Sequence, residues 1–409
     1  MSGMVRALSK PIGSSPDPAV PAPPRTPRRS LSRVVSTASL MLLLATAALA
    51  QTSSPGRLAE ARLASLWAAY TDHHLTPSGA VVDPLRQGRV TSEAQSYALL
   101  RAVWMRDCAT FARVLGWTDT HLRRPDGLYA WLYDPAEARV IDANLATDAD
   151  IDIAYALAMA SIVFDRPAYA RQARDVVVAI RTHAAVVTDR GWFPAAGNWA
   201  VPERVVNLSY FYPYATPWFE QLDPGMGWAR TNDLGYALLE SALAAGPAAL
   251  PADFNRLTAD GRLQPLPEGH ALSENFSYDA MRIAWRLEMG CRLGRDAAAC
   301  RASDALTRRL QTLLARDGRI VTQYGVDGAR RTAEQSSSFY AALLPAFSRL
   351  APAIARQWRA SHLGDAALEA LEAAPDRYYD ANWVWFGIAA AEGFLDARTP
   401  ALDRLRVPH

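Results

Sequence analysis

The sequence has very little of the residue types that support several common kinds of catalysis. Lysine occurs once in 409 residues, at Lys10, and the seven histidines show no paired spacing. A Walker P-loop and Schiff-base chemistry both need a lysine side chain. Both are therefore excluded for the chain beyond Lys10, and any chemistry there has to rest on other polar groups.

Cysteine is also scarce, with three residues in the whole chain. Three cysteines are too few for a disulfide framework. In an oxidising compartment Cys291 and Cys300 are close enough in sequence to pair across a turn between two helices, which would leave Cys108 as a buried thiol. The spacing alone does not decide between this pair and three free thiols.

Long hydrophobic runs are missing as well. The uncharged segment STASLMLLLATAALA (residues 36–50) follows four arginines and ends in a small-x-small pattern. It is shorter than the roughly 20 residues that span a bilayer, so a transmembrane anchor is the weaker interpretation. The pattern predicts a secretory signal peptide at residues 1–50, cleaved after Ala50, and hence a secreted or periplasmic protein. Arg28 and Arg29 also allow a twin-arginine route.

An excess of positive charge is absent once this leader is set aside. Residues 1–50 hold six of the 43 basic residues and one of the 41 acidic ones, so the remainder carries a net charge of −3. A mildly acidic chain of this kind is not typical of a nucleic-acid-binding protein. We expect no nucleic acid, no membrane after cleavage, no metal and no cofactor as partners.

The rest of the sequence is dominated by helical patterns. Apolar residues recur at three- and four-residue spacing with Pro, Gly and Asp in the connections. The predicted helices are 57–72, 92–115, 148–163, 166–184, 230–246, 275–293, 297–316, 335–350, 361–373 and 382–394, with minor hairpins such as Arg319–Gly325. We find neither a linker nor a repeat of fixed length, which favours one all-α domain over residues 51–409, arranged as a closed ring of helical pairs instead of a solenoid.

Aromatic side chains gather in the predicted connections. The chain has twelve tryptophans, and the connections hold Trp131, Trp192, Trp199, Tyr210, Phe211, Tyr212, Tyr214, Trp218 and Trp228. Sugars stack their C–H faces on such rings, so the set suggests platforms for a glycan. For any single ring, packing against the helical core is an equally good explanation.

Glu93 and Asp279 lie at positions where ordinary surface charge does not explain a carboxylate. Glu93 follows a Thr91-Ser92 cap, so the helix dipole can account for it, but its small and polar neighbours suit a ligand. Asp279 precedes Arg282 by three residues, which is the spacing of a helix salt bridge and also of an arginine that keeps a general base ionised. The spacing leaves both interpretations open.

Three further aspartates alternate in ATDADIDIAYALAMA (residues 146–160). Asp148, Asp150 and Asp152 resemble the start of a calcium loop, but the sixth and twelfth positions hold Ile153 and Met159 where Gly and Glu are required. The alternation also fits poorly with an aspartate-rich metal motif on one helical face. No metal site is therefore predicted here.

The same segment carries a family resemblance. It matches the signature of glycoside hydrolase family 8 from Ala146 to Ala154, and loosens only at Ala158 and at the missing closing tryptophan. VTSEAQSYALL, NLSYFYPYA, SYDAMRI and RYYDANWVWFG resemble other segments of that family in the same order. The resemblance is closest to the endoglucanases that accompany bacterial cellulose and other exopolysaccharide systems.

The resemblance implies an (α/α)6 barrel and hydrolysis of β-1,4-linked polysaccharide with inversion at the anomeric carbon. Carried over by position, Glu93 matches the general acid, Asp279 the general base, and Asp148 the carboxylate that holds the distorted sugar. The positions matching substrate-binding residues are Trp131, Tyr210, Tyr278, Arg282 and Tyr379. An inverting enzyme places its two carboxyl groups about 6.5–9.5 Å apart, and that separation is predicted for Glu93 and Asp279.

Several alternatives stay open at this point. A chitosanase, a lichenase or a xylanase of the same family would carry the same signature, and a glycan-binding protein could retain the groove without turnover. A polysaccharide lyase on the same barrel would use Tyr, His or Arg as its base. Ala94 and Ala98 replace glycines of the family pattern, and we expect them to narrow the cleft. We expect a monomer.

Overall fold

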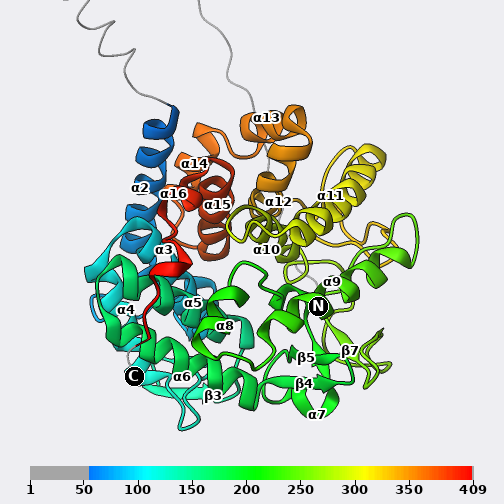
Figure 1. The fold of residues 1–409 in the computed structure, drawn as a ribbon. Helices are drawn as coiled ribbons and strands as arrows, with labels where there is room; N and C mark the ends of the chain where they lie inside the picture. The colour runs from blue at the N-terminus through cyan, green and yellow to red at the C-terminus, as the bar shows by residue number, and fades with distance from the viewer. Residues whose placement is uncertain (1–54, 408–409) are drawn as a thin grey trace, which may run out of the picture. The chain divides into compact units, whose positions relative to one another are not determined.

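Six helices form the inner ring of an (α/α)6 barrel (Figure 1), and each of them buries more than half of its residues, the short α8 the smallest share. In the computed structural model, which describes residues 55–407, α3 buries 12 of its 14 residues, whereas α11 of the outer ring buries 6 of 21. The inner helices are α3 (Ser92–Met105), α5 (Thr147–Val163), α8 (Thr216–Leu222), α10 (Arg282–Arg292), α12 (Ser337–Leu350) and α15 (Tyr378–Ala391). The leader predicted at residues 1–50 lies outside the described residues.

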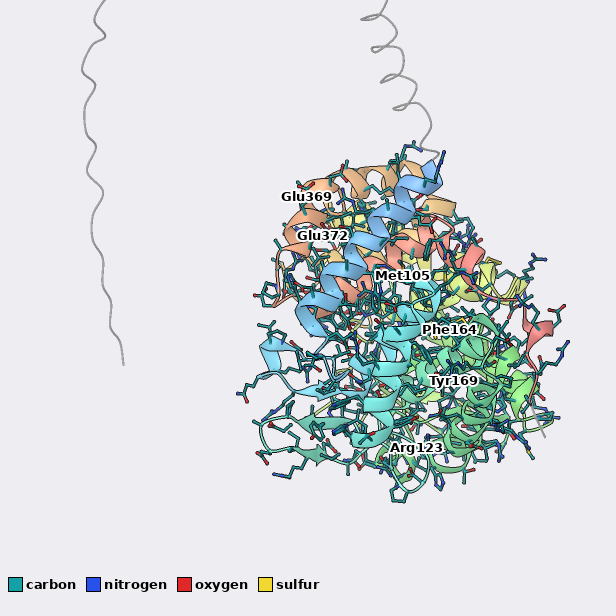
Figure 2. All side chains as sticks on the ribbon, turned by 90° about the vertical axis from the view of Figure 1, so that its left-hand side faces the viewer. Met105, Arg123, Phe164, Tyr169, Glu369 and Glu372 are labelled. Carbon is teal, nitrogen blue, oxygen red and sulfur yellow. A yellow bond between two sulfur atoms is a disulfide. The ribbon has the colours of Figure 1, made fainter. Side chains whose placement is uncertain are left out.

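The outer ring consists of amphipathic helices, each packed on the inner ring through one apolar face. These helices are α2 (Pro55–His74), α4 (Cys108–His121), α6 (Pro167–His183), α9 (Trp228–Ala244), α11 (Ala297–Asp317) and the short pair α13 (Pro352–Ser361) and α14 (Asp365–Glu372). Figure 2 views the side that α2 and α4 cover, where Phe164 and Tyr169 both pack against Phe111 of α4. Alternation of inner and outer helices along the chain confirms the predicted fold.

The ring closes between the first and last inner helices. Tyr97 of α3 makes edge contacts with Trp383 and Phe386 of α15, and Trp104 stacks on Trp385. Edge-to-face and offset-stacked rings are favourable geometries for buried aromatic pairs. The segments that join the barrel are therefore some 280 residues apart in sequence.

Small antiparallel sheets and short helices lie in the connections. The sheets are β1 (Val90–Thr91) with β2 (Leu132–Asp134) and β3 (Arg139–Asp142), β4 (Ala185–Thr188) with β5 (Gly191–Pro194), and β6 (Val205–Val206) with β7 (Asn255–Leu257) and β8 (Leu263–Gln264). The short helices are α7 (Ala200–Glu203), α16 (Phe394–Arg398), η1 (Pro84–Arg86), η2 (Leu208–Tyr210) and η3 (Leu402–Arg404). Within residues 55–407, no helix has the length and apolar character needed to cross a membrane.

Four of the predicted helices have wrong boundaries. One of them is the helix predicted at 382–394, since α15 runs from Tyr378 to Ala391. The helix predicted at 92–115 is two helices, because Arg106 adopts a left-handed conformation and Asp107 caps α4 by accepting from the backbone of Thr110. The helix predicted at 275–293 begins only at Arg282, after a turn, and the helix predicted at 361–373 is α14, with α13 before it. The hairpin expected at residues 319–325 reduces to isolated bridges at Tyr324.

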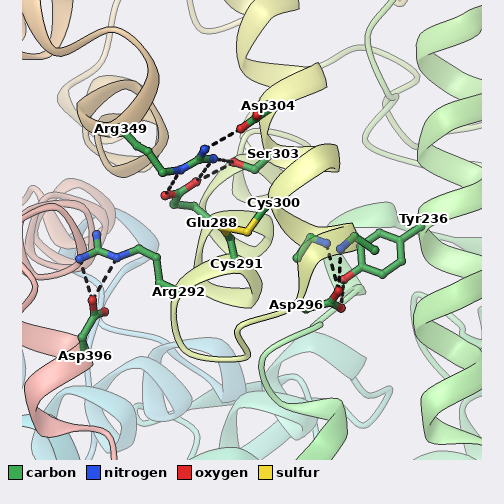
Figure 3. Close-up of a disulfide and its surroundings, with 12 residues drawn as sticks. Tyr236, Glu288, Cys291, Arg292, Asp296, Cys300, Ser303, Asp304, Arg349 and Asp396 are labelled. Atoms are coloured by element: carbon green, nitrogen blue, oxygen red, sulfur yellow. Dashed lines mark hydrogen bonds and ion pairs between the residues drawn. A yellow bond between two sulfur atoms is a disulfide. The ribbon is translucent and has the colours of Figure 1, made fainter.

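The disulfide between Cys291 and Cys300 joins the end of α10 to the start of α11 (Figure 3). Next to it, the buried Glu288 accepts hydrogen bonds from Arg349 and from the Ser303 hydroxyl, at 2.9 and 2.8 Å. This end of α10 is thus tied to both α11 and α12. Cys108 is free as expected, but it is half-buried and not fully enclosed.

Candidate active site

The main cleft opens where the first turns of five inner helices meet. Its volume is about 940 Å³, and it is lined by residues at the beginnings of α3, α5, α10, α12 and α15. Because the amino-terminal end of a helix carries a partial positive charge, this rim favours negatively charged side chains. Glu93, Asp148 and Asp279 all line this cleft, as the sequence predicted.

Glu93 occupies the first turn of α3. The Thr91 hydroxyl caps this helix by accepting from the backbone of Ala94 at 3.0 Å, as predicted. The carboxylate of Glu93 lies 3.2 Å from a guanidinium nitrogen of Arg282. Burial raises the pKa of Glu93 to about 7; Arg282 opposes this shift, and the nearby Asp148 and Asp279 reinforce it. Glu93 therefore keeps its proton to a higher pH than an exposed glutamate does.

The three alternating aspartates have separate partners. Asp148 lies 2.8 Å from Arg282 and lines the cleft, while its second oxygen, Oδ1, has no hydrogen-bond partner among the described residues. Asp150 accepts from the backbone of Tyr129 at 3.0 Å, and Asp152 lies 3.7 Å from Arg286 inside the barrel. Asp150 also keeps one buried oxygen, Oδ2, without a partner among the described residues, but of the three aspartates only Asp148 lines the cleft.

Asp279 lies in the turn that leads into α10. Its carboxylate bonds to Arg282 and accepts from the side-chain amide of Asn207 at 3.1 Å. Burial raises the pKa of Asp279 to about 6, against the effect of Arg282 and with that of the nearby Asp253 and Asp148. The side chain is 32% exposed, so it remains accessible from the cleft.

Arg282 is the common partner of all three cleft carboxylates. Its side chain is only 3% exposed, and one terminal nitrogen contacts Glu93 and Asp148 while the other contacts Asp279. A single cation cannot neutralise three anions, so a proton is retained most easily on the carboxyl group with the highest pKa. Of the two carboxyl groups whose pKa is raised, Glu93 has the higher value, so it keeps a proton more easily than Asp279 does.

The predicted substrate-binding side chains also reach the cleft. Trp131, Tyr210, Tyr278 and Tyr379 all line it. The pairing of Thr91 with Leu132 places Trp131 beside the start of α3. The Tyr379 hydroxyl donates to the backbone of Tyr278 at 3.0 Å, which connects the start of α15 to the turn that carries Asp279.

The aromatic platform is smaller than predicted. Of the nine rings expected from the connections, Trp131, Trp199 and Tyr210 line the cleft. Five are buried in the core: Phe211, Tyr212, Tyr214, Trp218 and Trp228. Trp192 packs edge-on against Trp228. Packing against the core therefore explains these six rings. Trp218 and Trp228 lie on α8 and α9 and not in connections, and the other four lie in connecting segments that pack against the core.

Two substitutions of glycine by alanine do not affect the cleft as expected. Ala94 and Ala98 are 1% and 0% exposed inside α3, and neither lines the cleft. The helix turns both methyl groups into the core. The expectation that they narrow the cleft was therefore wrong.

Several side chains of the site were not predicted from the sequence. Asn207, which bonds to Asp279, opens the segment NLSYFYPYA but carries no charge that would single it out. Phe254, Leu272 and Tyr378 also line the cleft. Phe254 and Leu272 come from connections with no local pattern that points to a ligand, whereas Tyr378 opens α15 inside the segment RYYDANWVWFG, beside the predicted Tyr379.

Metal ligands do not gather in the described part of the chain. Over residues 55–407 there is no group of three or more His, Cys, Asp or Glu side chains with the arrangement to hold a metal ion. The three cleft carboxylates share the guanidinium of Arg282.

Comparison with known proteins finds relatives over most of the chain. The family model described as Glycosyl hydrolases family 8 matches residues 33–379. An endoglucanase of Xanthomonas axonopodis pv. citri is 38% identical over 184 residues, which are 43% of this chain and 45% of that protein. An endoglucanase of Cellulomonas uda is 31% identical over 263 residues, 63% of this chain and 68% of that protein. The alignment with the first of these relatives therefore spans less than half of its length.

The fold is also found among solved structures. The crystal structure of an endo-1,4-D-glucanase from Vibrio fischeri ES114 superposes with a TM-score of 0.68 at 23% sequence identity. The superposition covers 79% of this chain and 93% of that one. At this identity the similarity supports the architecture of the barrel.

Proposed function

The chain belongs to glycosyl hydrolases family 8, and from this membership we propose that it is an inverting endo-β-1,4-glucanase acting on a cellulose-type polymer. The observation that carries the proposal is the set of three carboxylates around the buried guanidinium of Arg282, with two of them at pKa values of about 7 and 6. The relatives named as endoglucanases favour β-1,4-glucan over other substrates of the same chemistry.

Glu93 acts as the general acid in this proposal, and Asp279 as the general base. At about pH 6.5 Glu93 is mostly protonated and Asp279 mostly ionised. Asp279 removes a proton from a water molecule that attacks the anomeric carbon, while Glu93 donates its proton to the departing glycosidic oxygen. The C–O bond breaks as the new one forms on the opposite face, so the product has the inverted configuration.

Asp148 has a different role, because it already bonds to Arg282 and keeps one oxygen free. A carboxylate with an unsatisfied buried oxygen is suited to accept a hydrogen bond from a sugar hydroxyl. We assign it to the sugar at the cleavage point, where such a bond favours the distorted ring that precedes the transition state. Trp131 supplies a flat ring for a neighbouring sugar.

We further propose how the protein is exported and what it binds. Residues 1–50 act as a signal peptide, and the protein works as a secreted or periplasmic monomer without cofactor. The substrate is a polysaccharide, and no nucleic acid is involved.

Reducing-sugar release from carboxymethylcellulose tests the activity. The wild-type protein should release reducing ends, and Glu93→Gln should lower the rate by at least about 100-fold, because general acid catalysis contributes on the order of 10²–10⁴. Asp365→Asn is a matched control, since Asp365 is also a first-turn acid but lies exposed on α14 and pairs with Arg62. Equal activity of the Glu93 variant and the wild type would disprove the catalytic assignment, and a wild-type protein that only binds the polymer would be a glycan-binding protein.

Two further measurements refine the outcome. A panel of β-1,4-glucan, mixed-linkage glucan, chitosan and xylan, with sizing of the products, distinguishes the endoglucanase from a lichenase, chitosanase or xylanase. Proton NMR of the first product reports the anomeric configuration directly. Initial formation of the β-anomer would contradict inversion, and ultraviolet absorbance of the products would reveal a lyase.

A further inference from the structure

Asp253 is a fully buried carboxylate directly behind the turn that carries Asp279. It is 0% exposed, although it lies in a connection and not in a helix. Its Oδ1 accepts from the backbone N–H groups of Ser277 at 2.9 Å and Ala280 at 2.8 Å, and its Oδ2 accepts from the Ser277 hydroxyl. These bonds bracket Asp279 on both sides.

The backbone around Asp253 continues this support. The N–H of Asp253 donates to the carbonyl of Asn275 at 2.7 Å, and that of Phe254 donates to the carbonyl of Ser273 at 3.2 Å. Phe254 then lines the cleft. The segment 253–254 therefore holds the chain that enters the catalytic turn, as well as the turn itself.

The small sheet that follows connects Asp253 to the other partner of Asp279. Strand β7 begins two residues after Asp253, and its Asn255 pairs with Val206 of β6. Asn207 directly follows Val206 at the end of β6, and its side-chain amide donates to Asp279 at 3.1 Å. The same small sheet thus positions the Asn207 amide, which donates to the carboxylate of Asp279, and the Asp253 carboxylate, which accepts from the backbone on either side of Asp279.

We propose that Asp253 is a positioning residue for the reaction: by holding the Ser277–Ala280 turn, it sets the orientation of Asp279 toward the water that attacks the substrate. This inference rests on the proposed role of Asp279 as general base. A displacement of about 1 Å at a catalytic group can reduce a rate by roughly 100-fold, so a side chain that fixes this turn affects catalysis without contacting the substrate.

The charge of Asp253 has a second consequence. Burial raises the pKa of Asp253, while hydrogen bonds from the side chains of Ser277 and Ser273 and from the backbone of Ala280 and Ser277 favour its ionised form. As an anion near Asp279, it contributes to the raised pKa of that group. The other charged, titratable or polar groups that face Asp279 are Arg282, Asp148, Glu93, Tyr210, Tyr379 and Asn207. Loss of the Asp253 charge alone should therefore make Asp279 easier to ionise.

Two variants separate the effect of the Asp253 charge from that of its hydrogen bonds. Asp253→Asn is nearly isosteric: its carbonyl can accept from both backbone N–H groups, and its amide can donate to the Ser277 hydroxyl. We expect it to retain kcat at the optimum within about threefold, and to move the acid limb of the pH profile of kcat/KM to lower pH by roughly half to one unit. Asp253→Ala removes every acceptor, and we expect kcat at the optimum to fall at least about tenfold with little change in KM.

Asp296 offers a matched control (Figure 3). It also accepts from two backbone N–H groups, those of Ala298 and Ala299, and from the Tyr236 hydroxyl, but it caps α11 next to the disulfide and does not line the cleft. Asp296→Asn and Asp296→Ala should change thermal stability without moving the acid limb. If the Asp253 and Asp296 variants have the same kcat and the same pH profile, the proposal is wrong.

A further variant covers the case in which Asp253→Ala does not fold. Ser277→Ala removes only the hydroxyl donor, and it should lower kcat by a few-fold while the protein remains folded by circular dichroism. An unchanged kcat in Ser277→Ala together with an unmoved acid limb in Asp253→Asn would overturn the inference. The wild-type assay separates this result from failure of the proposed function, because an inactive wild type refutes the hydrolase itself.

Discussion

The pH dependence of the reaction follows from the two raised pKa values. The active form needs Glu93 protonated and Asp279 ionised, and their pKa values are about 7 and about 6. Activity should therefore fall below pH 6 as Asp279 gains a proton, and above pH 7 as Glu93 loses one. For such a pair, about 60% of the molecules are in the active form near pH 6.5, and about one tenth at pH 5 or pH 8.

Arg282 makes this a property of the pair and not of two independent groups. Both carboxylates contact the same guanidinium, so the limbs of the profile report apparent values that the two groups share. A change in the pKa of one carboxyl group therefore changes the pKa of the other. The expected curve is still a narrow bell, because burial raises both pKa values while the common cation prevents either from remaining protonated at high pH.

The assay is kcat/KM between pH 4 and pH 9 at constant ionic strength, with an uncharged soluble β-glucan so that the substrate does not titrate. Glu93→Gln is the informative variant, since glutamine cannot lose a proton. Its residual activity should lack the alkaline limb and keep the acid limb. A wild-type rate that stays at its maximum at pH 8, or an alkaline limb that persists in Glu93→Gln, would refute the assignment of Glu93 as the acid.

Two other changes have predictable results. Arg282→Met should raise the pKa of Asp279 and so move the acid limb to higher pH. It should also lower the free energy of unfolding by about 3–5 kcal/mol, because buried carboxylates lose their cation. Arg286→Met, the control inside the barrel, should lose stability but keep the acid limb, and an unmoved limb in Arg282→Met would contradict the reasoning. Replacing Cys291 and Cys300 by serine opens a loop of sequence separation 9 and should lower the free energy of unfolding by about 2–3 kcal/mol in urea denaturation, with kcat/KM unchanged. A large loss of activity in this double variant would mean that the disulfide positions the site.

The helices could be predicted well where a local pattern defines them. The amphipathic pattern places α6 at residues 166–184, and the structure has it at Pro167–His183. The errors arose where a backbone conformation or a tertiary contact decides the boundary. The break after α3 depends on the left-handed conformation of Arg106, and the start of α10 depends on bonds from Ser277 and Ala280 to Asp253, which lies 24 or more residues earlier in the chain.

The same division applies to the site. The motifs around Glu93, Asp148 and Asp279 single out these carboxylates because their residue types and order follow a recognisable signature. The contacts of Arg282 with all three carboxylates could not be predicted from sequence spacing, because Arg282 lies 189 residues from Glu93 and 134 from Asp148. Closure of the barrel brings them together, and the pKa values that separate acid from base depend on that burial.

The sequence by itself determined the helical fold class and the absence of lysine chemistry beyond Lys10, because these follow from local periodicity and from residue types. The three catalytic candidates came from the resemblance of their motifs to glycoside hydrolase family 8. The tertiary structure decided which rings face the cleft and which pack in the core, and which of the three alternating aspartates is free for a ligand. It also brought Asn207 and Asp253 to the turn of Asp279. Those outcomes depend on desolvation and on contacts between distant segments, which exist only after the inner helices have closed into a ring.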